Sequence, residues 1–249
     1  MFKNIGLDKC KVFITSEFLP KGVANRTALT PRPSITISRM TGAGGHTVAS
    51  ALADYLKERS PAHEEWTVFD QQLVEKTLED AHIAKRVTAF LEEGHKSMIK
   101  DSVEEWIGLH PSHWTLVQGI NATILRLAQV GNIIFIGRGS AVITSKLKNV
   151  FHVRLIGSLD RRIERVEQVH GLDRKAAASY IKKKDEGRKK YMKENFDVDI
   201  DDPRYYHVVI NTDLVGYDGA TRIIGNEVVA RFYQDKARAA DGMRQVVRQ

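Results

Sequence analysis

The chain has 249 residues, with 38 Lys or Arg against 31 Asp or Glu, which gives a formal net charge of +7 when histidine is neutral. A composition of 42% hydrophobic and 28% charged residues is typical of globular proteins and excludes a wholly disordered chain. The single cysteine, Cys10, excludes a scaffold held by internal disulfides. No apolar run approaches the ~20 residues of a membrane span, and no signal peptide is recognisable. We therefore expect a cytoplasmic protein without a membrane association, whose positive charge favours an anionic partner.

In chain order, a proline-containing start is followed by alternating strand and helix patterns. Residues 1–33 are predicted to form an N-terminal appendage, because Pro20, Pro31 and Pro33 break regular structure. The hydrophobic periodicity then predicts strands at 34–38, 66–70, 133–136, 150–156 and 207–211, and helices at 48–56, within 71–108, and at 114–130, 158–170, 173–193 and 217–233. This order predicts an α/β fold of three layers, in which helices cover both faces of about five parallel strands. Ligands in such folds bind beyond the carboxyl ends of the strands.

A glycine-rich segment, 38–47, joins the first predicted strand to the first helix. Its small residues allow backbone N–H groups to surround an anion at the start of the helix. Compared with the phosphate-binding signature G-x-x-x-x-G-K-[ST], Gly44 matches the second glycine, whereas Arg39 stands at the first glycine and Gly45 at the lysine. Thr47 could supply a hydroxyl to a metal ion. The loop alone leaves a degenerate phosphate-binding loop and a plain glycine turn equally open.

Polar residues follow the predicted strands at several carboxyl ends. Arg138 follows an apolar strand and must meet an anion if buried, and we favour an acceptor phosphate over a structural carboxylate. Asp70 either orients a ribose or base amine or caps the next helix, and Asn211 either lines an adenine site or forms a turn. Arg39 is interpreted as a phosphate ligand or a surface ion pair, and His46 as a phosphate donor or a helix cap.

The segment from Lys182 to Lys193 contains seven positive and two negative residues, so +5 of the net charge lies there. Part of this charge is explained by a solvated helix face. The other interpretation is a mobile lid whose cations meet phosphates on closure, with Lys184 and Arg188 on one face because they are four residues apart. Gly187 lies between them and could act as a hinge.

Taken in order, these segments resemble the cytidylate kinase-like family of P-loop proteins over about residues 34–233. The matching residues are Ile35-Thr36-Ile37-Ser38-Arg39 with Gly42-Ala43-Gly44-Gly45, Phe69-Asp70, Ile134 to Gly139, Val153-Arg154-Leu155 with Asp160, Arg161 and Arg162, then Asp185, Arg188 and Tyr191, and finally Tyr206 to Thr212. The resemblance implies the fold of nucleoside monophosphate kinases. It also implies phosphoryl transfer from ATP to CMP or dCMP with Mg²⁺.

The resemblance further implies a division of the chain and a set of roles. The kinase-like domain would span 34–233, with a monophosphate-side insertion at 71–112, a lid at 173–204 and a charged tail at 234–249. The loop residues Gly42, Ala43, Gly44, Gly45, His46 and Thr47 would surround the ATP phosphates, Asn211 would lie on the adenine side, and Asp70 and Arg138 would face the acceptor. Arg162, Lys184 and Arg188 would close over the transferring phosphoryl group.

The sequence departs from true cytidylate kinases at the loop lysine, which is Gly45, and beside Arg138, where Ile136 and Gly139 replace acidic residues. Phosphoryl transfer needs positive charge near the phosphates, and Arg39 is the candidate to replace the lysine. Two alternatives stay open: a nucleotide-binding regulator without transfer activity, and a kinase for another acceptor. A nucleic-acid partner is less expected, because the charge is concentrated in the predicted lid. A homo-oligomer is compatible with the sequence.

Overall fold

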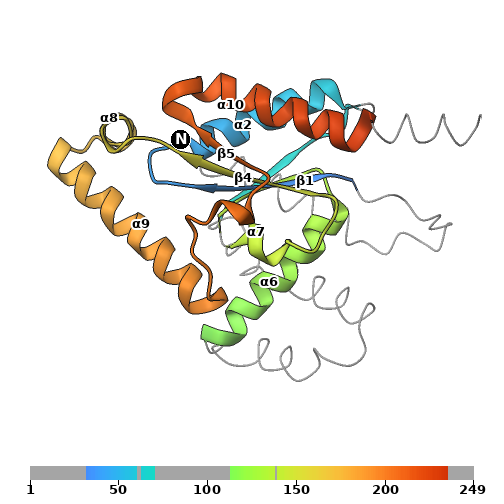
Figure 1. The fold of residues 1–249 in the computed structure, drawn as a ribbon, viewed down its shortest axis with the longest axis horizontal. Helices are drawn as coiled ribbons and strands as arrows, with labels where there is room; N and C mark the ends of the chain where they lie inside the picture. The colour runs from blue at the N-terminus through green and yellow to red at the C-terminus, as the bar shows by residue number, and fades with distance from the viewer. Residues whose placement is uncertain (1–31, 61–62, 71–112, 138, 235–249) are drawn as a thin grey trace, which may run out of the picture.

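A computed structural model describes residues 32–60, 63–70, 113–137 and 139–234 of the chain (Figure 1). Its centre is a parallel sheet in the order β2-β3-β1-β4-β5. The strands are β1 (Ser34–Arg39), β2 (Thr67–Asp70), β3 (Ile133–Ile136), β4 (Val150–Ile156) and β5 (Val208–Asn211). The predicted α/β fold with five parallel strands is therefore confirmed.

The strand register brings the carboxyl ends of three strands together. Ile37 of β1 pairs with Ile136 of β3, and Asp70 at the end of β2 pairs with the same residue. All four residues of β3 are buried, as expected for an apolar strand that is covered on both faces. The carboxyl ends of β1, β2 and β3 consequently lie side by side at one edge of the sheet.

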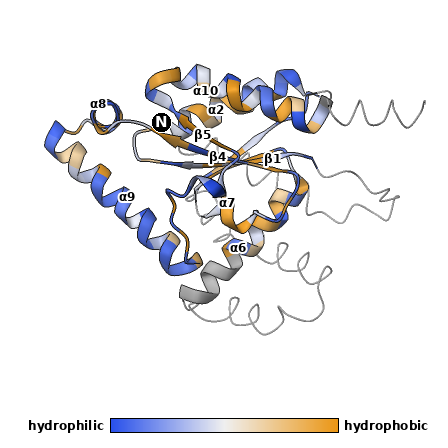
Figure 2. Cartoon of the chain, viewed as in Figure 1, coloured by the Kyte–Doolittle hydropathy of each residue, from blue (hydrophilic) through white to orange (hydrophobic). Residues whose placement is uncertain are grey.

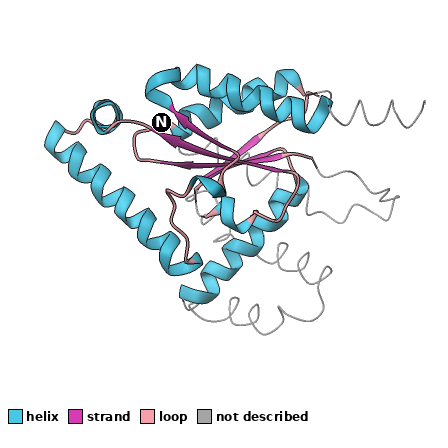
Figure 3. Cartoon of the chain, viewed as in Figure 1, coloured by secondary structure: helices cyan, strands magenta, loops and turns pink. Residues whose placement is uncertain are grey.

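Helices cover both faces of the sheet (Figures 1 and 3). On one face lie α2 (Gly45–Arg59) and α10 (Thr212–Val229), and on the other lie α6 (His113–Val130) and the short α7 (Ser140–Ile143). Apolar side chains of α2 and α10, such as Leu52 and Ile224, pack with strand residues in the main core. Burial of this continuous apolar surface is the main stabilising contribution to such a domain.

Two further helices extend beyond the sheet. α8 (Leu159–His170) and α9 (Arg174–Phe196) pack against each other through a small separate cluster of apolar side chains, Ile163, Val166, Ala177 and Ile181. Most of α9 is hydrophilic, as Figure 2 shows. The helix predicted at 173–193 is confirmed, and it continues through Gly187 without a break.

The structure differs from the predicted elements in three places. It adds α7, which is too short to produce a periodic pattern, and the 3₁₀ turn η1 (Pro203–Tyr205). α10 includes a helical turn at 212–215 that the sequence did not predict, and Gly216, whose φ of 67° and ψ of 172° are not helical, separates this turn from the helix predicted to start at Tyr217. The chain continues from α10 into η2 (Ala230–Gln234).

Residues 1–31, 71–112 and 235–249, together with Arg138, lie outside the described residues. The appendage, the insertion and the charged tail therefore stay predictions. The segment predicted as a lid, 173–204, is described, but its role as a lid stays a prediction. Among the described helices, none has the length and apolar character to cross a membrane.

Candidate functional site

The glycine loop lies between β1 and α2, at the carboxyl edge of the sheet. Gly42 and Gly44 both have left-handed backbones, with φ of 84° and 81°, and the amide of Ala43 donates to the carbonyl of Met40 at 3.2 Å. Among the described residues, no side chain caps the start of α2. Its first N–H groups are therefore available to an anion, which the positive end of the helix favours.

Close packing explains why small residues are needed in this loop. A Cβ at Gly44 would stand 2.2 Å from Cε1 of Tyr217, and one at Gly42 would stand 2.6 Å from the carbonyl oxygen of Arg162. The loop is thus fitted tightly between α8 and α10. Its backbone can approach a ligand closely because no side chain intervenes at these positions.

A cavity of about 560 Å³ opens beside the loop, between the carboxyl ends of β1, β2 and β3 and the facing side of α9. This volume is in the range of small-molecule sites. Residues from the sheet side of the cavity are Ser38, Arg39, His46, Asp70, Gly137, Gly139, Ser140 and Ala141, and those from α9 and the segment after it are Tyr180, Lys183, Lys184, Gly187, Arg188, Tyr191, Met192, Ile200 and Tyr206. Cations therefore face the cavity from both sides.

Arg39, the last residue of β1, lies against Gly45 of the loop. A Cβ at Gly45 would lie 2.9 Å from Cγ of Arg39, and one at Gly137 would lie 2.1 Å from its Nη1. Within the described part of the chain, no hydrogen bond or ion pair holds this guanidinium. Burial, followed by the charge of Arg188, lowers the pKa of Arg39 to about 10, so it stays positively charged at neutral pH.

His46 and Asp70 lie close together on the sheet side of the cavity. Nδ1 of His46 lies 4.0 Å from Oδ2 of Asp70. Desolvation, followed by the nearby charge of Arg39, lowers the pKa of His46, although Asp70 acts in the opposite direction. The imidazole is therefore mainly neutral at pH 7 and can donate or accept one hydrogen bond at the cavity.

The side chains of α9 bring the predicted lid cations to the cavity. Nζ of Lys184 lies 5.5 Å from the ring centre of Tyr180. Nη1 of Arg188 donates to Oδ1 of Asp185 at 2.9 Å, and Nη1 of Arg162, on α8, donates to Oδ2 of the same carboxylate at 2.7 Å. Burial lowers the pKa of Arg188, and the charge of Asp185 opposes this effect.

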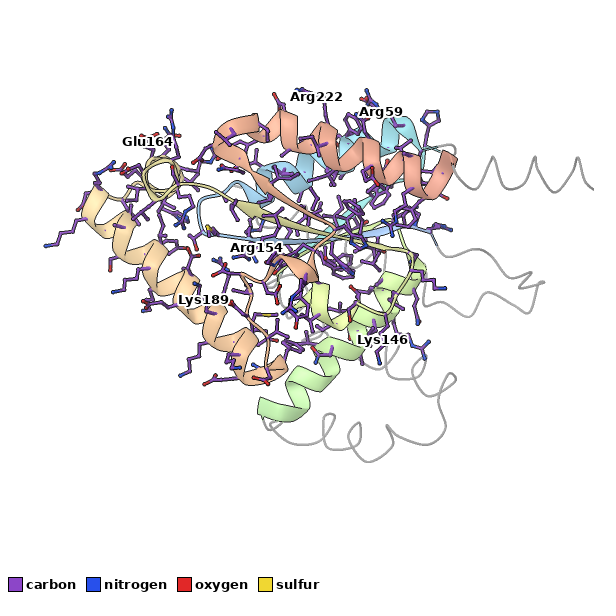
Figure 4. All side chains as sticks on the ribbon, in the orientation of Figure 1. Arg59, Lys146, Arg154, Glu164, Lys189 and Arg222 are labelled. Carbon is purple, nitrogen blue, oxygen red and sulfur yellow. The ribbon has the colours of Figure 1, made fainter. Side chains whose placement is uncertain are left out.

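The buried side chain of Arg154 contacts Ser38, which lines the cavity. Arg154 of β4 donates to Oγ of Ser38 at 2.8 Å and forms an ion pair with Asp201, which also accepts from Lys189 at 2.6 Å. The hydroxyl of Tyr206 lies 3.2 Å from the same Ser38 oxygen. Arg154 and Lys189 are labelled in Figure 4, where Arg154 lies between the sheet and α9. These bonds fix the segment after α9 against the end of β1.

A smaller hollow of about 260 Å³ lies near Gly42, beside α8 and the start of α10. Thr212, Asp213 and Tyr217 line it, together with Arg161, Glu164, Arg165 and Gln168. Asn211 itself caps α10 by accepting from the amide of Asp213 at 3.0 Å, and it lines neither cavity. Oγ1 of Thr47 accepts from Nη2 of Arg165 at 3.0 Å and also lies outside the lining of both cavities.

The structure thus gathers five of the predicted site residues around the main cavity: Arg39, His46, Asp70, Lys184 and Arg188. Arg162 lies behind them, next to the loop at Thr41, and Arg138 lies outside the described residues. Sequence reasoning missed the site contributions of Thr41, Lys183, Arg154, Tyr206 and Asp185. Arg154, Asp185 and Tyr206 stand among the residues that carry the family resemblance, and Asp185 also precedes Arg188 by three positions on one helix and so shares its face.

With this geometry in place, comparison with known proteins gives a consistent result. The model of the cytidylate kinase-like family matches residues 34–214. The chain belongs to this family. Family membership indicates a nucleotide kinase-like function, and use of ATP and Mg²⁺ is general in such proteins.

The chain is also similar to one curated protein and to one solved structure. A cytidylate kinase from Methanocaldococcus jannaschii is 23% identical over 128 residues, which cover 51% of this chain and 72% of that one. The crystal structure of an uncharacterized protein from Eubacterium ventriosum superimposes with a TM-score of 0.58 at 23% identity, covering 79% of this chain and 98% of that one. The second comparison shows a shared fold.

Proposed function

We propose that this protein transfers the terminal phosphoryl group of ATP to a nucleoside monophosphate, with CMP or dCMP as the acceptor that the family resemblance implies. One observation carries the proposal. Arg39 on the loop side and Lys183, Lys184 and Arg188 on α9 line one cavity at the strand ends. Phosphoryl transfer requires little more of a protein than correct positioning and positive charge around the phosphates.

Each side of the cavity has a distinct part in this proposal. The loop and the start of α2 hold the triphosphate, and Arg39 takes the place of the absent loop lysine. Arg188, Lys184 and Arg162 neutralise charge on the transferring group as it moves between donor and acceptor. Asp70 faces the acceptor nucleotide, and the neighbouring His46 donates to one of its oxygens or to a phosphate.

The residues present fit a magnesium ion that is held chiefly by nucleotide phosphates. In nucleotide sites Mg²⁺ takes one or two carboxylates and completes its shell with phosphate oxygens and water. Within the described residues there is no group of three metal-ligating side chains, and Asp70 supplies a carboxylate on the cavity wall. The ion would neutralise phosphate charge. The hydroxyl of Thr47, named as a ligand from sequence, is bonded to Arg165 away from the main cavity.

The smaller hollow is the place we propose for the base of ATP. It lies near Gly42, so a triphosphate in the loop could reach it, and Tyr217 supplies an aromatic face there. Cζ of Arg165 lies 5.5 Å from the centre of that ring. In this arrangement the base contact comes from Thr212, Asp213 and Tyr217, and Asn211 acts by capping their helix.

The test is a panel of acceptors. The purified chain is mixed with ATP, Mg²⁺ and each nucleoside monophosphate in turn, and ADP formation is measured for the wild type, Arg39→Ala, Arg188→Ala and the exposed control Arg222→Ala. We expect one acceptor, CMP or dCMP, to give turnover that both site variants reduce strongly and Arg222→Ala leaves unchanged. If no acceptor gives ADP faster in the wild type than in Arg39→Ala, monophosphate kinase activity is excluded.

The glycine at position 45 supports a second candidate function, a nucleotide-binding regulator without transfer activity. This function predicts ATP binding by calorimetry with no turnover of any acceptor. It also predicts that Arg39→Ala weakens ATP binding, because the guanidinium then acts only as a phosphate ligand. Phosphorylation of any small acceptor above the Arg39→Ala background would exclude this alternative.

A further inference from the structure

The carboxylate of Asp185 is surrounded by donors from three separate segments of the chain. Its Oδ1 accepts from the amide of Thr41 at 2.8 Å, from the hydroxyl of Thr41 at 2.7 Å and from Nη1 of Arg188 at 2.9 Å. Its Oδ2 accepts from Nη1 of Arg162 at 2.7 Å. A residue of α9 is thus bound directly to the glycine loop, 144 residues away in sequence.

These donors are of the kind that proteins use to bind phosphate. They comprise a loop N–H, a hydroxyl and two guanidinium groups, which give charge-assisted bonds to anionic oxygens. The two arginines also contact Thr41 itself: Nη1 of Arg162 donates to its carbonyl at 3.2 Å and Nη1 of Arg188 to its hydroxyl at 2.5 Å. The donors therefore form one connected anion-binding site.

The internal carboxylate only partly satisfies this site. Asp185 carries one negative charge against the two positive charges of Arg162 and Arg188, so the cluster keeps a net positive charge. A phosphoryl group offers three acceptor oxygens and up to two negative charges. It would therefore match the same donors more completely than the carboxylate does.

We infer that Asp185 occupies, in the unliganded protein, a phosphoryl-binding site formed by Thr41, Arg162 and Arg188, and that a nucleotide phosphate displaces it. The inference deepens the proposed function, on which it rests, by identifying a competing internal ligand. Asp185 would hold α9 against the glycine loop, and binding would exchange this contact for one between the same arginines and the phosphate.

If phosphate displaces Asp185, removal of its carboxylate should change phosphate affinity in one direction. If Asp185 only positions the arginines, the change should be in the opposite direction. If the carboxylate competes with phosphate, its removal leaves the donors free and tightens phosphate binding, because the binding-competent state no longer has to be formed by displacement. If Asp185 instead holds the arginines in place for the ligand, its removal loosens them and weakens binding. The direction of the change therefore distinguishes the two roles.

The experiment measures binding of inorganic tripolyphosphate to the full chain by calorimetry. The variants are Asp185→Asn, Asp185→Ala and the control Glu186→Gln, which makes the same charge change at the adjacent exposed residue of α9, whose carboxylate lies 3.9 Å from Lys182. Competition predicts that both Asp185 variants lower the Kd by roughly 5–10-fold relative to Glu186→Gln. Circular dichroism of each variant confirms the fold, and Asp185→Ala keeps the test valid if the side-chain amide introduced by Asp185→Asn rebinds Thr41.

The inference is overturned if both folded Asp185 variants bind tripolyphosphate no more tightly than Glu186→Gln. Tripolyphosphate binding does not depend on an acceptor nucleotide. A chain that shows the tightening but phosphorylates no monophosphate would therefore support the inference and exclude the proposed kinase activity, so the two failures are distinguishable.

Discussion

The side chain of Arg39 fills the space into which a side chain at Gly45 would project. A Cβ at position 45 would lie 2.9 Å from Cγ and 3.3 Å from Cδ of Arg39. Position 45 is where the phosphate-binding signature has its lysine. The glycine and the arginine are therefore two parts of one arrangement, in which the cation comes from the end of β1 rather than from the first residue of α2.

This relationship predicts the behaviour of three variants. Arg39→Ala should lower kcat with the best acceptor by about 10²–10³-fold, which is typical when one preorganised charge at a transition state is removed. Gly45→Lys alone should also lower activity, because the new stem collides with Arg39. The double variant Arg39→Ala/Gly45→Lys should recover part of the activity, because the lysine then has room to reach the phosphates.

Steady-state kinetics of all three variants, with Arg222→Ala as the control for loss of a surface arginine, check this prediction. The idea of a relocated cation is wrong if the double variant is no more active than Arg39→Ala. It is equally wrong if Gly45→Lys retains wild-type activity, because both side chains would then fit together.

The ion pair between Arg154 and Asp201 should respond asymmetrically to substitution. Arg154 has only 4% of its side chain exposed, whereas Asp201 is 33% exposed and has a second partner in Lys189. Asp201→Asn leaves a buried guanidinium uncompensated and should destabilise the protein by about 3 kcal/mol. Arg154→Met leaves the carboxylate paired with Lys189 and should cost less.

Urea unfolding of the two variants measures this difference, and Lys189→Met, which removes only the exposed partner, serves as the control. Arg154→Met should still reduce activity, because it removes the bond to Ser38 on the cavity wall. Equal destabilisation by Asp201→Asn and Arg154→Met would show that burial of the guanidinium does not determine the energetics of this pair.

The sheet could be predicted from the sequence because each strand is a short apolar run that ends in a polar or glycine-rich segment. The run Ile133–Ile136 is an example, because a strand that is buried on both faces is apolar at every position. α7 has no such signal, because four residues contain little more than one helical turn. The helix boundary at Gly216 could be predicted, because glycine punctuates helices, and its backbone is indeed non-helical there; the turn at 212–215 is too short to give a pattern of its own.

The candidate site was predictable only where its residues follow strands. Arg39 and Asp70 could be placed from chain order alone, because carboxyl ends of parallel strands meet at one edge. The contact between Asp185 and Thr41 joins residues that are far apart in sequence, and its geometry depends on how α9 packs on α8. No local pattern encodes that packing, so the sequence showed the charged residues of the basic helix, Asp185 included, but not the contact of Asp185 with Thr41.

The packing of Tyr217 against Gly44 gives a prediction about the stability of the loop. Gly44 and Gly171 both have positive φ, of 81° and 64°, but a Cβ at Gly44 would meet Tyr217 at 2.2 Å whereas one at Gly171 would meet nothing within 4 Å. Gly171→Ala should therefore cost about 1 kcal/mol from backbone strain alone. Gly44→Ala should cost more, because the ring must also move.

Denaturant unfolding of the two alanine variants compares the same backbone strain with and without the steric contact. Gly44→Ala/Tyr217→Ala removes the clash, so Gly44→Ala should be less destabilising when it is introduced into Tyr217→Ala than into the wild type. If Gly44→Ala and Gly171→Ala have the same effect, the contact with Tyr217 does not constrain the loop.

The buried imidazole of His152 predicts an acid-sensitive fold. Its Nδ1 lies 2.9 Å from the hydroxyl of Thr36, and its ring lies 5.0 Å from that of His207. Burial, followed by the charges of His207 and Arg231, lowers the pKa of His152 to about 4 from its ordinary 6.5. Between these two pH values the unfolded chain binds a proton that the folded chain does not.

Stability should therefore be lost as the pH falls from about 6.5 toward 4. Each pH unit in this interval contributes up to about 1.4 kcal/mol, so His152 accounts for a loss on the order of 3 kcal/mol. His207, whose pKa is also lowered by burial, changes stability in the same direction. Urea unfolding at a series of pH values should show a smaller slope for His152→Gln than for the wild type. Parallel curves for the wild type and His152→Gln would mean that His152 is protonated equally in the folded and unfolded states.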